Sequence, residues 1–154
     1  DSAAIEDAIT HALHTFSADH QVPATLVLLQ PTSPLRKSST ISDAVRLFTE
    51  NGSVGSVYGV IEAEHHPYKT FIANDSTLLP VGSIEDLSRS RHELPKAYRQ
   101  SGSIYVVGVQ DFLTSNSLHI SPVRWIEVGQ EEAIDVDTPA DLEAVRQAAR
   151  NANA

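Results

Sequence analysis

The feature that most constrains the fold is an apolar run, ATLVLLQP at residues 24–31, which a helix pattern and a second β-prone run follow. A short continuous apolar run closed by proline is typical of a strand that is buried on both faces of a parallel sheet. Residues 41–50 have helical periodicity that stops at Asn51-Gly52, and residues 53–63 favour a strand. A strand, a helix and a strand in this order predict a βαβ crossover.

The remaining patterns add elements around this crossover. We expect helices at residues 2–16 and from the end of the acidic stretch to about 149, strands at 101–109 and 123–129, and a short helix or turn at 111–117. Residues 64–100 mix short β-prone pieces with turn residues and most of the basic side chains, so we interpret them as an inserted arm. The chain of 154 residues is therefore predicted to be a single α/β domain with an arm.

The acidic stretch AIDVDTPADLEAV, residues 133–145, begins like a buried strand but carries two aspartates. In a strand, Ile134 and Val136 would share one face, and Asp135 and Asp137 would share the other. Two carboxylates roughly 6 to 7 Å apart along a strand repel each other, and a divalent cation removes that repulsion. Magnesium suits the pair because it takes one or two protein carboxylates and completes its shell with water and phosphate oxygens. Open α/β sheets bind their ligands at this end of the strands.

A helix start explains the same residues without any metal. Thr138 can be the N-cap, Pro139 the first helical residue and Asp141 an acid in the first turn. An acidic pair beside a helix N-terminus is also favoured by the helix dipole alone. From this stretch by itself, both interpretations stay open.

Composition excludes several classes of protein. The sequence has no cysteine, so it has no disulfide, thiolate metal site or cysteine nucleophile. No run is long enough to span a bilayer, and we expect a soluble, cytoplasmic protein. The net charge of −9 argues against nucleic acid as a partner. Residues 36–100 hold eight basic and eight acidic side chains, and we expect an anion to bind in this balanced middle part.

Phosphate-loop and nucleophile-elbow motifs are missing, which disfavours a P-loop, a dinucleotide fold and a hydrolase triad. A set of polar residues remains near predicted strand ends or in the arm: Gln30, Arg36, Lys69, Arg91, Arg99, Tyr105, Asp135 and Asp137. Fixed cations opposite an acidic metal pair are what transfer of a nucleotidyl group to an anionic acceptor requires.

The chain resembles the CMP-sialic acid synthetases, which are the acylneuraminate cytidylyltransferases. The resemblance is carried by four stretches in the family's order and approximate spacing: LLQPTSPLR (28–36), HHPYK (65–69), RHELPKAYRQSGSIYV (91–106) and EEAIDVDTPADL (131–142). It implies a Rossmann-like, mixed and mostly parallel sheet of the nucleotidyltransferase type with an inserted dimerisation arm. It also implies transfer of CMP from CTP to the anomeric hydroxyl of a nonulosonic, sialic-type sugar acid, with release of pyrophosphate and with Mg²⁺ as cofactor.

The resemblance further implies a role for each residue in the matching stretches. Asp135 and Asp137 would be catalytic by holding the metal. The substrate-binding residues would be Gln30, Lys69, Arg91, Arg99 and Tyr105. Among these, Gln30 would contact the sugar and Tyr105 would line its pocket. Lys69 and Arg91 lie on the arm that family members exchange across a dimer, so they would reach the sugar site of the neighbouring subunit.

The sequence departs from the family's pattern at three places. Ser101-Gly102 stands where the family has Asn-Gly, and Leu118 and His119 stand where many sialic acid enzymes have an aromatic pair. These two changes leave the identity of the sugar open. The family's nucleotide loop, rich in Gly and Lys or Arg, lies before the helix with which this chain begins, so we expect the N-terminal strands and roughly the first third of a family member to be absent from it.

Two expectations follow from that absence. We expect that this chain alone does not turn over CTP at an appreciable rate, and release of pyrophosphate at family-like rates from CTP and a sugar acid would contradict this. The run at 24–31 would be left with an exposed apolar edge, which native proteins cover, so we expect a homodimer or a higher self-associated form.

Two other classes of function stay open as alternatives. The first is a non-catalytic dimeric module that keeps the sugar-acid pocket without the nucleotide half. The second takes Asp-Val-Asp at 135–137 as the DxD metal motif of a glycosyltransferase. It ranks last, because in those enzymes an acceptor-binding region follows the motif, whereas only a terminal helix follows here.

Overall fold

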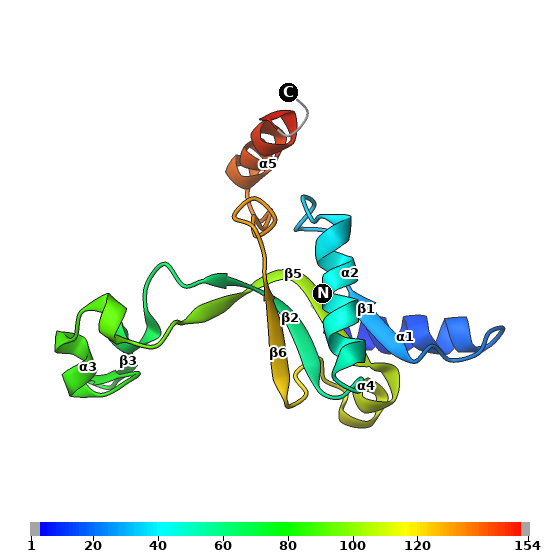
Figure 1. Cartoon of the computed structure of the whole chain (residues 1–154), viewed down its shortest axis with the longest axis horizontal. Helices are drawn as coiled ribbons and strands as arrows, with labels where there is room; N and C mark the ends of the chain where they lie inside the picture. Colours follow the sequence, from blue (N-terminus) through cyan, green and yellow to red (C-terminus); the bar gives the residue numbers. More distant parts are fainter. Residues whose placement is uncertain (1–3, 152–154) are drawn as a thin grey trace.

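A four-stranded sheet forms the centre of the computed structural model, which describes residues 4–151 (Figure 1). The strands lie in the order β1 (Thr25–Leu28), β5 (Tyr98–Gly108), β2 (Ser56–Glu62) and β6 (Val123–Glu127). Strand β5 pairs antiparallel with both β1 and β2, and β2 pairs parallel with β6. Three strands therefore share one direction and β5 alone opposes them. The predicted mixed, mostly parallel α/β sheet is confirmed.

The helices form close to the predicted positions: α1 (Ile5–Ser17), α2 (Ser38–Glu50), α4 (Val109–Ser115) and α5 (Pro139–Asn151). The first residues of the predicted N-terminal helix lie outside the described part of the chain. Helix α2 ends at its predicted stop, because Asn51 is its C-cap. Within residues 4–151, no helix is both long and apolar enough to cross a bilayer.

The region predicted as an arm leaves the sheet after β2 and returns to it at β5. It contains the 3₁₀ turn η1 (Pro67–Lys69), the hairpin strands β3 (Phe71–Asn74) and β4 (Thr77–Pro80), helix α3 (Ile84–Ser88) and the 3₁₀ turn η2 (Arg91–Glu93). Figure 1 shows this region, in green, projecting away from the central sheet. The predicted arm at 64–100 overlaps the sheet only in its last three residues, which already belong to β5.

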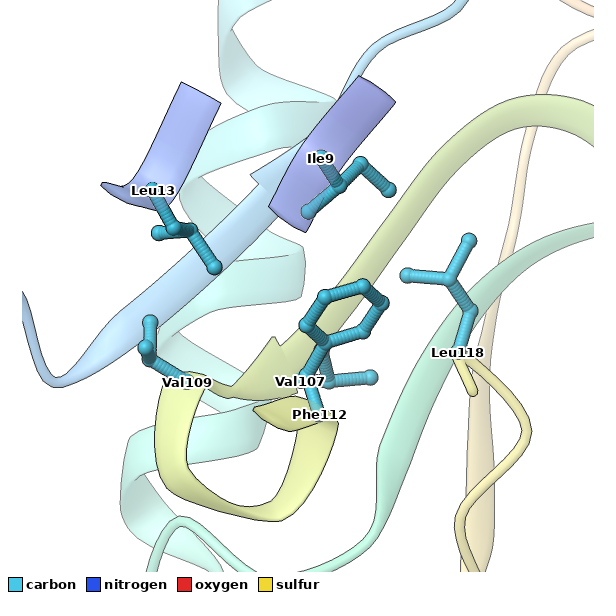
Figure 2. Packing of buried hydrophobic residues seen from close by; sticks show 6 residues of the cluster. All are labelled: Ile9, Leu13, Val107, Val109, Phe112 and Leu118. Carbon is cyan, nitrogen blue, oxygen red and sulfur yellow. The ribbon is translucent and has the colours of Figure 1, made fainter. Parts of the chain in front are cut away.

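Helices cover both faces of the sheet. Neighbouring residues of β5 point to opposite faces, so each face has apolar side chains that a helix can bury. Val106 packs with Phe48 of α2 on one face. Val107 packs on the other face with Leu13 of α1 and Phe112 of α4, as Figure 2 shows. Of these five apolar side chains, Leu13 is 8 % exposed and the other four are at most 1 % exposed. The result is a three-layer arrangement with the sheet in the middle.

Strand β1 differs from its prediction. Its residues are half-buried rather than fully buried, and its only strand neighbour among the described residues is β5, which runs antiparallel to it. The predicted crossover from β1 through α2 to β2 exists, but β5 lies between the two strands. The outer edge of β1 is therefore free of strand pairing within the described part of the chain.

The prediction of an acidic strand at residues 133–137 is also wrong. Residues 134–136 belong to no helix or strand, and they form no ladder with another strand. Pairing of β6 with β2 ends near Glu127, and a turn at residues 129–133 then carries the chain away from the sheet. An apolar and polar alternation alone cannot make a strand where no neighbouring strand is available to accept its hydrogen bonds.

Candidate functional site

The segment that follows β6 leads from β2 to the loop after the opposite edge strand, β1. Its start is beside β2, because the Val128 N–H donates to the Val60 carbonyl oxygen at 2.9 Å. Its end is beside the loop after β1, because the Val136 N–H donates to the Thr32 carbonyl oxygen at 2.8 Å. Asp135 is thereby carried from one edge of the sheet to the carboxyl end of β1, where α/β sheets bind ligands.

A bulge in β5 lies at the same end of β1. Tyr58 pairs with Tyr105 and Val60 pairs with Gln100, so residues 101–104 all lie opposite Gly59. Within this bulge the Ser101 hydroxyl donates to the Gly59 carbonyl oxygen at 2.9 Å. A Cβ on Gly59 would come within 2.9 Å of side-chain atoms of the bulge, so glycine is required beneath it. Bulges of this kind often re-aim backbone and side chains next to active sites.

Gly102, in the bulge, is the point at which the predicted site residues meet. Its φ of +76° is the left-handed conformation that favours glycine. The position that a Cβ would take here lies 3.1 Å from Oε1 of Gln30, 4.0 Å from Oδ2 of Asp135 and 4.0 Å from Oγ of Ser33. Gln30 and Asp135 are more than 100 positions apart in the sequence, yet they flank the same glycine.

Tyr105 belongs to the same cluster. Burial raises the pKa of its phenol, and the charges of Tyr58 and Asp135 raise it further. Its hydroxyl donates to Oε1 of Gln100 at 3.3 Å, and its ring meets the Tyr58 ring edge to face at 5.3 Å. Three separate segments, the loop after β1, strand β5 and the loop after β6, therefore bring Gln30, Tyr105 and Asp135 together.

The two predicted metal ligands have free, exposed carboxylates. Asp135 and Asp137 are exposed while Ile134 and Val136 are half-buried, so the predicted alternation is confirmed although the strand is not. Among residues 4–151, no lysine, arginine or histidine forms an ion pair with either aspartate. The same residues hold no group of three or more His, Cys, Asp or Glu side chains that could bind a metal by themselves. This donor set fits Mg²⁺, which takes few protein carboxylates, better than zinc.

The helix start behind the pair uses a different acid. Oδ2 of Asp141 accepts hydrogen bonds from the Thr138 N–H and hydroxyl, both at 2.7 Å, and from the Asp137 N–H at 3.3 Å. The hydrogen bonds from Thr138 hold the pKa of Asp141 below its usual value. The predicted cap of α5 is confirmed. Because Asp141 caps this helix, the helix start does not account for the carboxylate of Asp135.

Arg36 makes hydrogen bonds within the loop that follows β1. Nη1 of Arg36 donates to the carbonyl oxygens of Gln30 at 2.6 Å and of Ser33 at 2.5 Å. Burial lowers the pKa of this guanidinium. Arg36 therefore holds the loop in shape. The Ser33 hydroxyl is buried and has no hydrogen-bond partner among the described residues, although it lies beside Gly102.

The predicted cations of the arm lie elsewhere. Nζ of Lys69 donates to the carbonyl oxygens of Leu87, at 2.8 Å, and of Arg89. Arg91 donates to the Ala63 carbonyl oxygen at 2.5 Å. The described contacts of these two cations are thus all with the arm or its root, and none is with Gln30 or Asp135.

Arg99 lies between the Gln30 cluster and the cations of the arm. It is in β5 next to Gln100, whose carbonyl oxygen accepts from Arg99 at 3.3 Å. With Arg91, Glu62 and Gln130 it lines a cavity of about 480 Å³ at the root of the arm. Of the predicted site residues, the structure therefore gathers Gln30, Tyr105 and Asp135 into one cluster and leaves Lys69 and Arg91 on the arm.

Several residues near the cluster of Gln30, Tyr105 and Asp135 carried no clear signal in the sequence. Tyr58 hydrogen-bonds at 2.8 Å with Nδ1 of His119, one of the two residues at the position of the family's aromatic pair. Glu132 is a buried glutamate, 4 % exposed, in a segment that reads as a loop. Only Gly102 could have been inferred, because an isolated glycine in a β-prone run indicates a bulge or a close approach.

The fold of the described residues is of the nucleotidyltransferase type, as a solved structure shows. The structure is similar to the crystal structure of 4-diphosphocytidyl-2C-methyl-D-erythritol synthase from Anaerococcus prevotii, with a TM-score of 0.63 over 97% of this chain and 68% of that chain. The sequence identity is 9%, so the likeness is one of fold. No family model matches the chain.

Curated proteins that are similar in sequence to this chain have names of cytidylyltransferases or CMP-sugar-acid synthases. The chain is 30% identical over 132 residues to the N-acylneuraminate cytidylyltransferase of Streptococcus agalactiae serotype III, which is 84% of this chain and 31% of that protein. It is 32% identical over 118 residues to the CMP-N,N'-diacetyllegionaminic acid synthase of Legionella pneumophila, which is 75% of this chain and 50% of that protein. The resemblance inferred from the four sequence stretches is confirmed. The chain spans about a third to a half of the length of these relatives.

Proposed function

We propose that the chain supplies the sugar-acid side of a cytidylyltransferase site that transfers CMP from CTP to a sialic-type sugar acid. In this reaction the anomeric hydroxyl oxygen of the sugar attacks the α-phosphorus of CTP. A bond from that oxygen to the α-phosphorus forms, the bond from the α-phosphorus to the oxygen that bridges to the β-phosphate breaks, pyrophosphate leaves with that oxygen, and the hydroxyl proton passes to water. The names of the curated relatives, N-acylneuraminate cytidylyltransferase and CMP-N,N'-diacetyllegionaminic acid synthase, support this reaction class.

The observation that carries the proposal is the meeting of Gln30 and Asp135 at Gly102, with Tyr105 close enough to Asp135 for that charge to raise the pKa of its phenol. An amide and a phenol offer hydrogen bonds to the hydroxyl groups of a sugar, and the carboxylate stands beside them. The buried Ser33 hydroxyl, which has no partner within residues 4–151, adds a donor that a water or a ligand group can satisfy. A solvated surface gives no reason for these groups to converge from three separate segments.

Asp135 and Asp137 would hold Mg²⁺ when CTP is bound. The metal would neutralise negative charge on the phosphates that develops during the transfer. The chain's own part is to present two carboxylates that no protein cation occupies in the described residues. Gln30 and Tyr105 would orient the acceptor hydroxyl next to that metal.

Removal of either aspartate is expected to weaken metal binding. In NMR spectra with CTP and Mn²⁺ as the probe, the amides of residues 101–103 and 134–138 should broaden selectively. Asp135→Asn and Asp137→Asn should each raise the Mn²⁺ concentration needed for this broadening about tenfold, because one of two carboxylate ligands is lost, which is about 1.4 kcal/mol.

Asp19→Asn is the matched control for this experiment. It makes the same change of charge at an exposed position, in the loop between α1 and β1, and should leave the broadening unchanged. Equal broadening in Asp135→Asn, Asp137→Asn and the unsubstituted chain would rule out the proposed metal site.

Calorimetry with N-acetylneuraminic acid, with and without CTP and Mg²⁺, separates the cytidylyltransferase site from the non-catalytic sugar-acid-binding module. Binding of the sugar acid that neither CTP nor Mg²⁺ affects would favour the non-catalytic module.

We also propose that the arm makes a homodimer. Its hairpin exposes an unusual amount of apolar surface for a protein monomer, with Phe71, Ile72, Leu78 and Leu79 each between 47 and 62 % exposed. Lys69 and Arg91 do not contact the Gln30 cluster of their own chain, and a dimer formed through the arm would place them nearer to the site of the partner. The free outer edge of β1 is a second surface that self-association can cover.

Charge placed on the hairpin is expected to break this dimer. Leu78→Asp should raise the dissociation constant at least tenfold in sedimentation equilibrium, because a carboxylate would have to be buried in the apolar contact. Val22→Asp introduces the same charge at an apolar side chain that is 41 % exposed and outside the arm, and it should have no effect. A monomeric unsubstituted chain at micromolar concentration would contradict the proposal.

A further inference from the structure

Glu132 is a buried carboxylate that caps a helix far from it in the sequence. Its Oε1 accepts from the Lys37 N–H at 2.8 Å and from the Thr40 hydroxyl at 2.7 Å. Its Oε2 accepts from the Gly129 N–H at 3.1 Å. Lys37 is the N-cap residue of α2 and Thr40 is the third residue of that helix. Both carboxylate oxygens are therefore occupied by the chain itself.

Helix α2 needs this external cap. No side chain at its N-cap makes a capping hydrogen bond, and its first turn contains no acidic residue. In a capping box, the third residue of the helix supplies an acid that accepts from the N-cap N–H. In α2 that position is Thr40, and Glu132 reaches the same N–H from 95 positions further along the chain. The negative charge is also favourable at this end of the helix dipole.

The anchoring by Glu132 bears directly on Asp135. The segment is held at Glu132 by α2 and at Val136 by the hydrogen bond of 2.8 Å to the Thr32 carbonyl oxygen. Asp135 lies between these two anchors, only a few residues from each. An extended residue spans about 3.3 Å, so a segment this short leaves Asp135 little freedom to move away from Gly102.

We propose that Glu132 is the positioning residue that holds Asp135 in the candidate site. It does so through the backbone of residues 132–136 and without contact to a ligand. Its part in catalysis rests on the proposed function of Asp135. The positional part, in which Glu132 sets the distance between Asp135 and Gly102, is independent of what the site binds.

The first test measures position. In the unsubstituted chain, NMR should show nuclear Overhauser contacts between Gly102 and Asp135 and slow hydrogen exchange at the Val136 amide. Glu132→Gln removes the charge and turns a donor toward the Gly129 N–H. It should weaken the contacts and speed exchange at Val136 at least tenfold under conditions where the chain stays folded. Glu131→Gln makes the same change at the exposed neighbouring residue and should alter neither measurement.

The second test measures binding of Mn²⁺ at the candidate site. With CTP present, Glu132→Gln should raise the Mn²⁺ concentration needed for selective broadening about as much as Asp135→Asn does. Suppose that neither the unsubstituted chain nor any variant binds Mn²⁺, but Glu132→Gln still loses the contacts between Gly102 and Asp135. The proposed metal function then fails and the positioning role stands. If Asp135→Asn weakens Mn²⁺ binding while Glu132→Gln keeps both the binding and the contacts, the positioning role is overturned.

A third variant covers the case in which Glu132→Gln does not fold. Thr40→Val keeps the carboxylate and removes one of its three hydrogen bonds. It should speed exchange at Val136 by a smaller factor, about threefold, and weaken the contacts between Gly102 and Asp135. Unchanged exchange and unchanged contacts in this variant would contradict the proposal, whatever the stability of Glu132→Gln.

Discussion

Replacement of Gly55 by alanine is expected to destabilise the chain by about 3 to 5 kcal/mol. A Cβ at this position would lie 2.0 Å from the carbonyl oxygen of Pro122, well inside contact distance. That oxygen accepts the hydrogen bond of 3.1 Å from the Ser56 N–H, at the start of β2. Because Pro122 leads into β6, the clash would push the starts of β2 and β6 apart and disturb the parallel pair that precedes the acidic segment. Urea unfolding followed by circular dichroism measures the loss.

Gly52→Ala separates the clash from backbone strain. Both glycines have left-handed backbone, with φ of +81° at Gly55 and +76° at Gly52, so alanine is strained by about 1 to 2 kcal/mol at either position. No described atom lies within 4 Å of a Cβ on Gly52, so only the strain should be measured there. An equal loss of stability in the two variants would show that the close approach of Pro122 does not matter.

Truncation of Phe112 to alanine is expected to cost a similar amount, about 3 to 5 kcal/mol, because it empties the centre of a closed core. Phe112 of α4 is 0 % exposed and packs among residues of α1, β5 and the loop that carries Leu118 (Figure 2). Tyr105 packs against the same cluster. The variant should therefore also loosen Tyr105, which NMR line widths of its ring can report.

Leu113→Ala is the matched control on the same helix. Leu113 follows Phe112 but is 41 % exposed, so its truncation should change stability by less than about 1 kcal/mol. Thermal or urea unfolding compares the two variants directly. A loss below 1 kcal/mol for Phe112→Ala would mean that α4 is not part of the core that supports the site.

Local features of the site could be predicted from the sequence because their causes are local. The start of α5 at Pro139 needs only Thr138 and Asp141, which lie within one helical turn of each other. The exposure of Asp135 and Asp137 follows from an alternation that any extended segment obeys, with or without a sheet. The stop of α2 at Asn51 depends in the same way on neighbouring residues.

Features that depend on distant partners were predicted wrongly or not at all. The segment at 133–137 was predicted as a strand, but whether an extended segment pairs depends on which strand lies beside it. The run at 24–31 was expected to be buried on both faces, but β1 lies at an edge of the described sheet next to the reversed strand β5. Neither neighbour can be inferred from the residues of the segments themselves.

The sequence by itself determined the order of the helices and strands outside the arm, apart from the strand predicted at 133–137, the class of the fold and, through four matching stretches, the kind of relatives. These depend on periodicity, caps and turns, which act over a few residues. Only the tertiary structure decided that Gln30 and Asp135 flank Gly102, that Glu132 caps α2, and that Lys69 and Arg91 stay with the arm. Contacts between residues that are 95 or more positions apart depend on the order of the strands in the sheet, and no local sequence pattern predicts that order.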